Sequence, residues 1–145
     1  MRSIAIAIVA CLLVFGAGCG DDEAPEDPTE PATITYSRSG GVAGIDETLT
    51  VRPDGSGEFE RGSAGDSPVD RFQLEPSRHE ELTEVVGELD FAALDAGQSA
   101  TCADCFIYEI SYGDSTLTAD DVTAKPELRR ALSALNEAIR TRPSH

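Results

Sequence analysis

Hydrophobic and polar residues alternate along four short segments between residues 32 and 75, with the period of two that is typical of strands buried on one face. These segments cover residues 32–38, 48–52, 58–62 and 69–75. The second and third are joined by Pro-Asp-Gly-Ser-Gly, in which the proline and the Asp-Gly pair favour a tight turn. The pattern therefore predicts a hairpin and two further strands, and it places Phe72 and Leu74 on the same face of the last strand.

The period changes to that of a helix after the fourth strand. Apolar residues recur at intervals of three and four and predict a helix over residues 78–89: Leu82, Val85, Val86 and Leu89. Ser77 and Glu80 have the spacing of a capping box, so we expect the Ser77 side chain to cap the first turn. Phe91 and Leu94 are expected to pack where the chain leaves the helix.

A second hairpin and a second helix complete the pattern. Aromatic and aliphatic residues alternate over residues 106–112, and the turn Gly-Asp-Ser leads into a return strand at 116–120. Pro126 opens a helix that ends near Arg140, and its apolar residues form one stripe: Leu128, Ala131, Leu132, Leu135, Ala138 and Ile139. We therefore predict an α+β fold, in which an antiparallel sheet of about five to six strands carries two amphipathic helices on one face.

Residues 1–18 have the features of a secretory signal, with the basic Arg2 followed by a continuous apolar stretch that ends in small residues. This stretch is shorter than the roughly 20 residues that a membrane-spanning helix needs. The sequence Gly-Ala-Gly-Cys at Cys19 resembles the lipobox of bacterial lipoproteins, which implies that Cys19 is lipidated. Cys11 has a better local match but too short an apolar stretch before it, and an ordinary signal peptide cut near Ala17 is the alternative.

Composition divides the rest of the chain in two. Residues 19–31 are acidic and rich in proline, which predicts a disordered linker, and residues 32–145 are long enough for one domain. We expect this domain to be monomeric, exported, and attached to the cell envelope membrane through the lipid on Cys19. The chain has 27 acidic and 11 basic residues, a net charge of -16 that repels phosphates and argues against nucleic acid as a partner.

No set of residues in the sequence indicates catalysis or metal binding. The stretch from His79 to Thr83 lacks the second histidine of the zinc-protease motif, and the only other histidine is the terminal His145. A serine hydrolase would need a Gly-x-Ser-x-Gly turn as well as a histidine base, and that turn is missing. Asp120 and Asp121 could touch a calcium ion but lack a calcium-binding loop. We therefore expect a protein that is not an enzyme and that uses no cofactor or metal.

Cys102 and Cys105, in Cys-Ala-Asp-Cys, lead directly into the strand predicted at 106–112. A redox Cys-x-x-Cys pair is activated by a helix N-terminus, and no helix is predicted to follow this one. In an exported chain, a local disulfide is the first expectation. Free or metal-binding thiols are the second interpretation, and redox catalysis is the third.

Three glycines lie directly after the first predicted strand, in the sequence Ser-Gly-Gly-Val-Ala-Gly-Ile. A phosphate-binding loop would need a following Lys-Ser or Lys-Thr pair and a helix, and neither is present. A flexible connection with positive φ is the simplest interpretation, but it does not explain why Val42 and Ile45 would be displayed there. An exposed glycine loop with apolar tips is suited to insertion into the cleft of another protein.

The order of these motifs resembles emfourin, a family of small bacterial inhibitors of protealysin and related thermolysin-type metallopeptidases. The resemblance covers residues 33–139 and rests on the strand that ends in arginine before Ser-Gly-Gly-Val-Ala-Gly-Ile, on Asp-Phe-Ala-Ala-Leu after the first helix, and on the strand in Cys-Ala-Asp-Cys-Phe-Ile-Tyr-Glu-Ile-Ser-Tyr. It implies an α+β fold and a domain that occludes a protease active site. The chain departs from the emfourins paired with protealysin-like enzymes, which are bare cytoplasmic domains, in its export signal and its cysteine pair.

The resemblance leads us to expect a lipid-anchored, extracytoplasmic inhibitor whose partner is a secreted metallopeptidase of the thermolysin or protealysin type. The alternatives are a non-catalytic surface lipoprotein that binds another ligand and, less favoured, an exported redox protein. A Gly41→Asp change is expected to weaken inhibition and to leave folding intact. The candidate protease-binding residues form one continuous segment: Arg38, Ser39, Gly40, Gly41, Val42, Ala43, Gly44 and Ile45.

Overall fold

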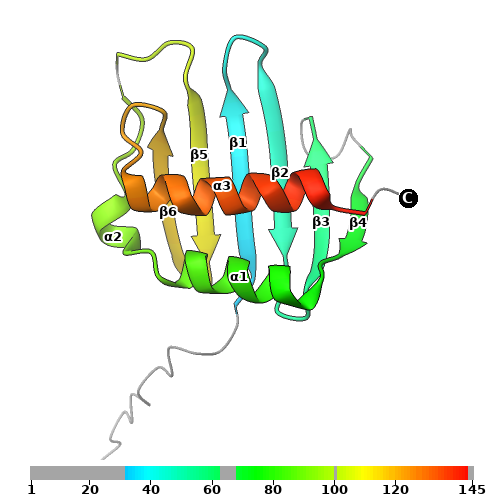
Figure 1. Ribbon diagram of the computed structural model, residues 1–145. Coiled ribbons are helices and arrows are strands. Elements are labelled where there is room, and N and C mark those ends of the chain that lie inside the picture. Colours follow the sequence, from blue (N-terminus) through cyan, green and yellow to red (C-terminus); the bar gives the residue numbers. More distant parts are fainter. Residues whose placement is uncertain (1–31, 63–67, 100, 144–145) are drawn as a thin grey trace, which may run out of the picture.

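The computed structural model describes residues 32–62, 68–99 and 101–143, and these residues form one six-stranded antiparallel sheet with helices on one face (Figure 1). The order of the strands across the sheet is β4-β3-β2-β1-β5-β6. The first strand is therefore central, and it pairs with both β2 and β5. The strands are β1 (Ile34–Gly40), β2 (Ile45–Val51), β3 (Ser56–Arg61), β4 (Asp70–Gln73), β5 (Phe106–Tyr112) and β6 (Ser115–Asp120).

Two longer helices, α1 (Pro76–Gly87) and α3 (Pro126–Thr141), lie against the same face of the sheet, and α3 crosses its strands (Figure 1). A short helix, α2 (Phe91–Leu94), follows α1 at the β6 edge. The core lies between the sheet and the two longer helices. This arrangement confirms the predicted α+β fold, including the antiparallel sheet and the two helices on one face.

The alternation seen in the sequence is the reason for this core. Every second residue of β1 and β2 points towards the helices, so that Ile34, Tyr36, Leu49 and Val51 are at most 1% exposed. The apolar stripe predicted for the last helix is buried at all six positions: Leu128, Ala131, Leu132, Leu135, Ala138 and Ile139. Burial of one such side chain contributes roughly 1.5 to 3 kcal/mol, so the stripe is what holds α3 on the sheet.

The start of α1 differs from the capping box expected at Ser77. The helix begins at Pro76, and its N-cap residue is Glu75, which makes no side-chain capping hydrogen bond. Proline suits the first helical position because its φ is already helical and its missing N–H needs no partner. Ser77 therefore lies inside the first turn, where its hydroxyl cannot cap. The sequence also did not predict that Phe91–Leu94 would form a helical turn, which Asp90 caps by accepting a hydrogen bond from the Ala93 N–H at 3.0 Å.

The expected signal segment at 1–18, Cys19 and the linker at 19–31 all lie outside the described residues, so these expectations stay predictions. Among the residues that the structure describes, no helix has the length and apolar character needed to cross a membrane.

Candidate interaction surface

The glycine-rich segment forms the connection between β1 and β2, and it is shorter than expected. Gly40 ends β1 and Ile45 begins β2, so only residues 41–44 make the turn. The Gly44 N–H donates to the Gly41 carbonyl oxygen at 3.0 Å. Gly41 and Gly44 both have positive φ, at 70° and 59°, which other residues adopt at a cost. At the tip, the Val42 side chain is 91% exposed.

This connection rests on the start of β5. The Gly41 N–H donates to the Cys105 carbonyl oxygen at 3.2 Å. A Cβ atom on Gly41 would lie 2.6 Å from Cε1 of Phe106, and one on Gly40 would lie 2.7 Å from the Cys105 oxygen. Glycine is thus required by close packing as well as by φ. The expectation that Gly41→Asp leaves folding intact takes no account of this packing. An aspartate there would have to displace the Phe106 ring, so we expect the change to destabilise the domain.

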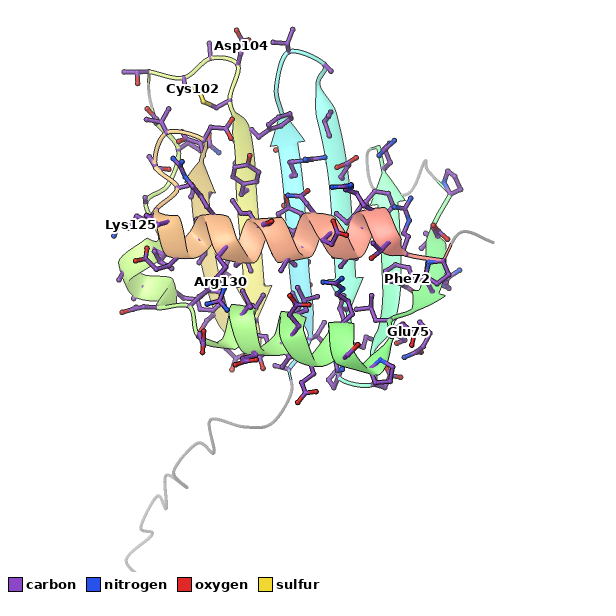
Figure 2. All side chains as sticks on the ribbon, in the orientation of Figure 1. Phe72, Glu75, Cys102, Asp104, Lys125 and Arg130 are labelled. Atoms are coloured by element: carbon purple, nitrogen blue, oxygen red, sulfur yellow. A yellow bond between two sulfur atoms is a disulfide. The ribbon has the colours of Figure 1, made fainter. Side chains whose placement is uncertain are left out.

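Cys102 and Cys105 form a disulfide with their Cα atoms 5.6 Å apart, directly before β5 (Figure 2). The disulfide closes a tight loop in which Asp104 is exposed. Because Cys105 accepts the hydrogen bond from Gly41, this loop is connected to the glycine turn. Sequence reasoning treated the two motifs separately, and the structure brings them together.

Arg38 does not project from the loop but belongs to a charge network on the inner face of the sheet. Register places Arg38 opposite Glu47, and Glu47 opposite Arg61, across three strands. The Glu47 side chain is 2% exposed and is bound by the Arg38 guanidinium on one side and by Arg61 at 2.8 Å on the other. The Arg38 guanidinium also lies over the Phe106 ring, 5.2 Å from its centre. Arg38 thus supports the packing beneath the glycine turn.

Glu47 was not identified from the sequence, although a signal for it exists. It shares its side of β2 with the buried Leu49 and Val51 and is a charged residue at an inward position of an alternating strand. A buried charge is costly unless it is paired. An inward carboxylate therefore implies cationic partners on the neighbouring strands, but only the strand register identifies them.

A second polar cluster lies where β5 meets the turn after β6. The Asp121 carboxylate accepts hydrogen bonds from the Tyr108 hydroxyl at 2.6 Å and from the Phe106 N–H at 2.9 Å. Burial, and then the hydrogen bond to Asp121, raise the pKa of Tyr108. Asp121 thus joins the turn after β6 to β5.

Tyr36 lies deeper, in the core between the sheet and α3. Burial raises the pKa of Tyr36 to about 12, and its hydroxyl faces the Asn136 amide without a well-formed hydrogen bond.

Asp120 shapes that turn from inside. Its buried carboxylate accepts hydrogen bonds from the N–H groups of Val122 at 2.9 Å and Thr123 at 2.8 Å, and another from Ser99. These bonds, with Ser99 the main contributor, lower the pKa of Asp120. The turn presents Val122, which is 62% exposed. Asp120 and Asp121 therefore organise the loop by binding protein N–H and O–H groups.

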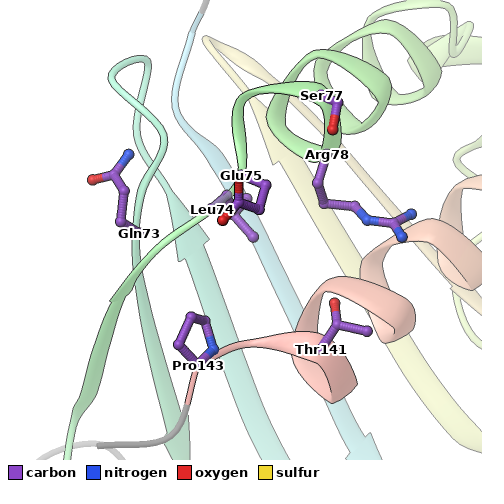
Figure 3. Close-up of a pocket in the computed structure, with 7 residues that line it drawn as sticks. All are labelled: Gln73, Leu74, Glu75, Ser77, Arg78, Thr141 and Pro143. Carbon is purple, nitrogen blue, oxygen red and sulfur yellow. The ribbon is translucent and has the colours of Figure 1, made fainter.

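Two shallow hollows lie on the surface near the glycine turn and near the start of α1. One of about 490 Å³ lies beside the glycine turn, and its lining includes Gly44, Glu47 and Arg61. The other lies between the start of α1 and the end of α3 (Figure 3). There Arg78 is paired with Glu81 at 2.7 Å, and the lining residues include no histidine that could act as a base for Ser77. Within residues 32–62, 68–99 and 101–143, no three histidine, cysteine or acidic side chains are grouped so that they could hold a metal ion.

Comparison of the chain with protein-family models and with curated proteins finds no match. The structure shows a small α+β domain with an exposed turn that carries Val42 at one end of its sheet.

Proposed function

We propose that this protein is a non-catalytic, lipid-anchored inhibitor that acts outside the cytoplasm on a thermolysin- or protealysin-type metallopeptidase by inserting the turn at residues 41–44 into the protease cleft. The observation that carries the proposal is Val42, which is 91% exposed on a turn that is itself fixed. A fixed loop loses little conformational entropy on binding. An exposed valine gains the free energy of burial when a partner covers it.

Resistance to cleavage is the second requirement of an inhibitor, and the packing of the turn supports it. A protease cuts a segment that can adopt an extended conformation in its active site. The turn is held by the hydrogen bond from Gly41 to Cys105, by the contact with Phe106, and by the bond between Gly41 and Gly44. Opening it would break these interactions together.

The position of the turn also suits a tethered protein. Ala32, the first described residue, precedes β1, and the turn follows β1. The seven residues of that strand separate the two by roughly 23 Å. An attachment on the N-terminal side of the domain would therefore leave the turn at the far end, directed away from the membrane.

The proposal is tested by titrating thermolysin and a protealysin-type protease with the expected mature chain without its lipidated cysteine, residues 20–145, under non-reducing conditions. We expect stoichiometric inhibition, with the chain recovered intact by mass spectrometry. A Val42→Asp change should weaken inhibition at least about tenfold, because it places a charge where an apolar contact is expected. Thr33→Asp is the matched control, since it adds the same carboxylate at an exposed position at the other end of β1.

Three outcomes separate the candidates. Inhibition that is lost with Val42→Asp and kept with Thr33→Asp supports insertion of the turn. Inhibition that survives Val42→Asp would reject the turn as the inhibitory element. No inhibition by a chain shown to be folded would reject the inhibitor and leave the alternative, a surface lipoprotein that binds a different ligand.

A further inference from the structure

The two large hydrophobic side chains that stand exposed in the described part of the chain lie at the same end of the sheet. They are Val42, in the turn after β1, and Val122, in the turn after β6, with 91% and 62% exposure. Pairing fixes their common location: Gly40 is opposite Phe106, and Asp120 is opposite Ile107, so both turns lie beside the start of β5. The disulfide loop, residues 102–105, leads into β5, which lies between β1 and β6 in the sheet. Figure 2 shows Cys102 and Asp104 at this end of the strands.

The three loops are joined to one another. The first contact is the hydrogen bond from the Gly41 N–H to the Cys105 oxygen at 3.2 Å. The second is the hydrogen bond from the Phe106 N–H to the Asp121 carboxylate at 2.9 Å. Val122 is the next residue after Asp121. A chain of direct contacts therefore runs from the glycine turn through the disulfide loop to the turn after β6.

Three carboxylates face solvent at this end of the sheet. Asp46, Asp104 and Asp121 are exposed around the two valines. The cations at this end are engaged within the chain: Arg38 and the largely exposed Arg61 bind Glu47. Arg129, which lines a hollow with Tyr108 and Asp121, donates its Nε–H to the Ala124 oxygen at 3.0 Å. Apolar groups surrounded by charges are the usual composition of a protein interface, with a dry centre and a polar rim. The partner surface that complements this end carries apolar positions bordered by lysine or arginine.

We infer that the glycine turn, the disulfide loop and the turn after β6 form one docking surface for a protein cleft with two apolar subsites and a basic rim. We call it the three-loop surface; it comprises residues 41–44, 102–105 and 121–123. The valines are separated by two to three strand spacings, roughly 10 to 15 Å, which fits within one interface of ordinary size. This inference rests on the proposed function, because it takes Val42 as a contact and adds Val122 as its equal.

The first test uses the protease titration with the chain of residues 20–145. We expect Val122→Asp to weaken inhibition at least about tenfold, as Val42→Asp does, while its melting temperature stays that of the parent chain. Asp104→Lys should also weaken inhibition, and more so at low salt, whereas Glu84→Lys on α1 makes the same change of charge away from the surface and should have little effect. A Val122→Asp variant of full potency would overturn the three-loop surface and leave insertion of the glycine turn standing.

The second test does not depend on a protease. A synthetic peptide with two leucines flanked by arginines is added to the 15N-labelled chain, and amide chemical shifts are followed; a peptide with glutamates in place of the arginines is the control. We expect shifts in residues 41–44, 102–105 and 121–123 together, with the arginine peptide alone. Shifts confined to one loop, or located elsewhere, would overturn the inference even where no protease is inhibited.

Discussion

The aromatic ring of Phe106 fills the space that a side chain on Gly41 would occupy, since a Cβ there would lie 2.6 Å from the ring. Phe106 is at the start of β5, and Gly41 follows the end of β1, so this contact connects two motifs that are far apart in the sequence. The glycine turn is therefore held against the sheet by packing. Its rigidity, on which the proposed function depends, can be tested through this contact.

Gly41→Ala should destabilise the domain more than Gly44→Ala. Both glycines have positive φ, which costs alanine about 1 to 2 kcal/mol, but only at Gly41 does the new Cβ meet a neighbour. Overpacking against Phe106 adds about 1 to 3 kcal/mol. Urea unfolding of the two variants measures the difference.

The Phe106→Ala background is the control for this comparison. Once the ring is removed, Gly41→Ala should cost no more than Gly44→Ala, because the steric contact is gone while the backbone cost remains. An unchanged excess cost in that background would show that Phe106 is not the cause.

Glu47→Gln should lower the free energy of unfolding by about 1 to 3 kcal/mol. The change keeps the shape of the side chain but leaves Arg38, whose side chain is 23% exposed, without its anionic partner. The Arg61 side chain is 70% exposed and loses little, which keeps the figure at this modest level. Asp46→Asn, at the exposed neighbouring position, should change stability by less than about 0.5 kcal/mol in the same urea experiment. Equal effects of the two variants would contradict the role of the network.

Removing the disulfide should cost about 2 kcal/mol, the loop-entropy value for a closed loop of this size. It should also loosen the glycine turn, because Cys105 accepts the Gly41 hydrogen bond. Urea unfolding of a Cys102→Ser, Cys105→Ser double variant gives the first quantity, and hydrogen exchange at the Gly41 amide gives the second. Exchange that is no faster than in the parent chain would mean that the turn does not depend on the disulfide.

Ionisation of Tyr36 should contribute to alkaline unfolding. Burial raises its pKa from 10.0 to about 12, so the native state favours the neutral phenol. The stability that this provides is fully present below pH 10 and is lost as the pH rises through about 12. Tyr36→Phe should therefore unfold at higher pH than the parent chain, as followed by circular dichroism.

The same variant identifies the group directly. The phenolate absorbance of the parent chain minus that of Tyr36→Phe gives the titration of Tyr36 alone, which we expect near pH 12 in the folded state. At neutral pH the change should alter stability by less than about 1 kcal/mol, because the hydroxyl has no well-formed hydrogen bond to lose. A phenolate that forms near pH 10 would contradict the burial of Tyr36.

Asp120 should contribute to stability at neutral pH and lose that contribution in acid. Hydrogen bonds from Ser99 and the turn lower its pKa below the ordinary 3.8, so the stabilisation is present above that value and is lost as the pH falls through the lower native value. Asp120→Asn should melt at a lower temperature at neutral pH and show a smaller fall in melting temperature on acidification. Asp114→Asn, in the exposed turn between β5 and β6, should follow the parent chain at every pH.

Much of the fold could be predicted because the signals are local. The period of two in residues 106–112 and the apolar stripe of α3 predict which side chains face the core. The structure buries Ile110 and the six stripe residues as expected. The start of α1 was misassigned because Ser77 and Glu80 satisfy a spacing rule, while Pro76 decided where the helix begins. Local patterns of this kind compete within a few residues, and spacing alone does not rank them.

The candidate surface was predicted only in part. Exposure of Val42 follows from its place among glycines, whereas the pairing of Arg38 with Glu47 was not predicted, because nothing in the sequence joins these two residues. That pairing needs the register between β1 and β2, and the contribution of Val122 needs the position of β6. Strand register and order depend on contacts between distant segments, which no local period encodes.

The sequence by itself determined which segments form the six strands and the two longer helices, and which of their faces are apolar, because these depend on the spacing of neighbouring residues. Only the tertiary structure decided that β1 lies between β2 and β5. That order brings the glycine turn onto Phe106 and Val42 to the same end of the sheet as Val122. The physical reason is that burial of one sheet face and completion of the backbone hydrogen bonds are optimised over the whole chain at once.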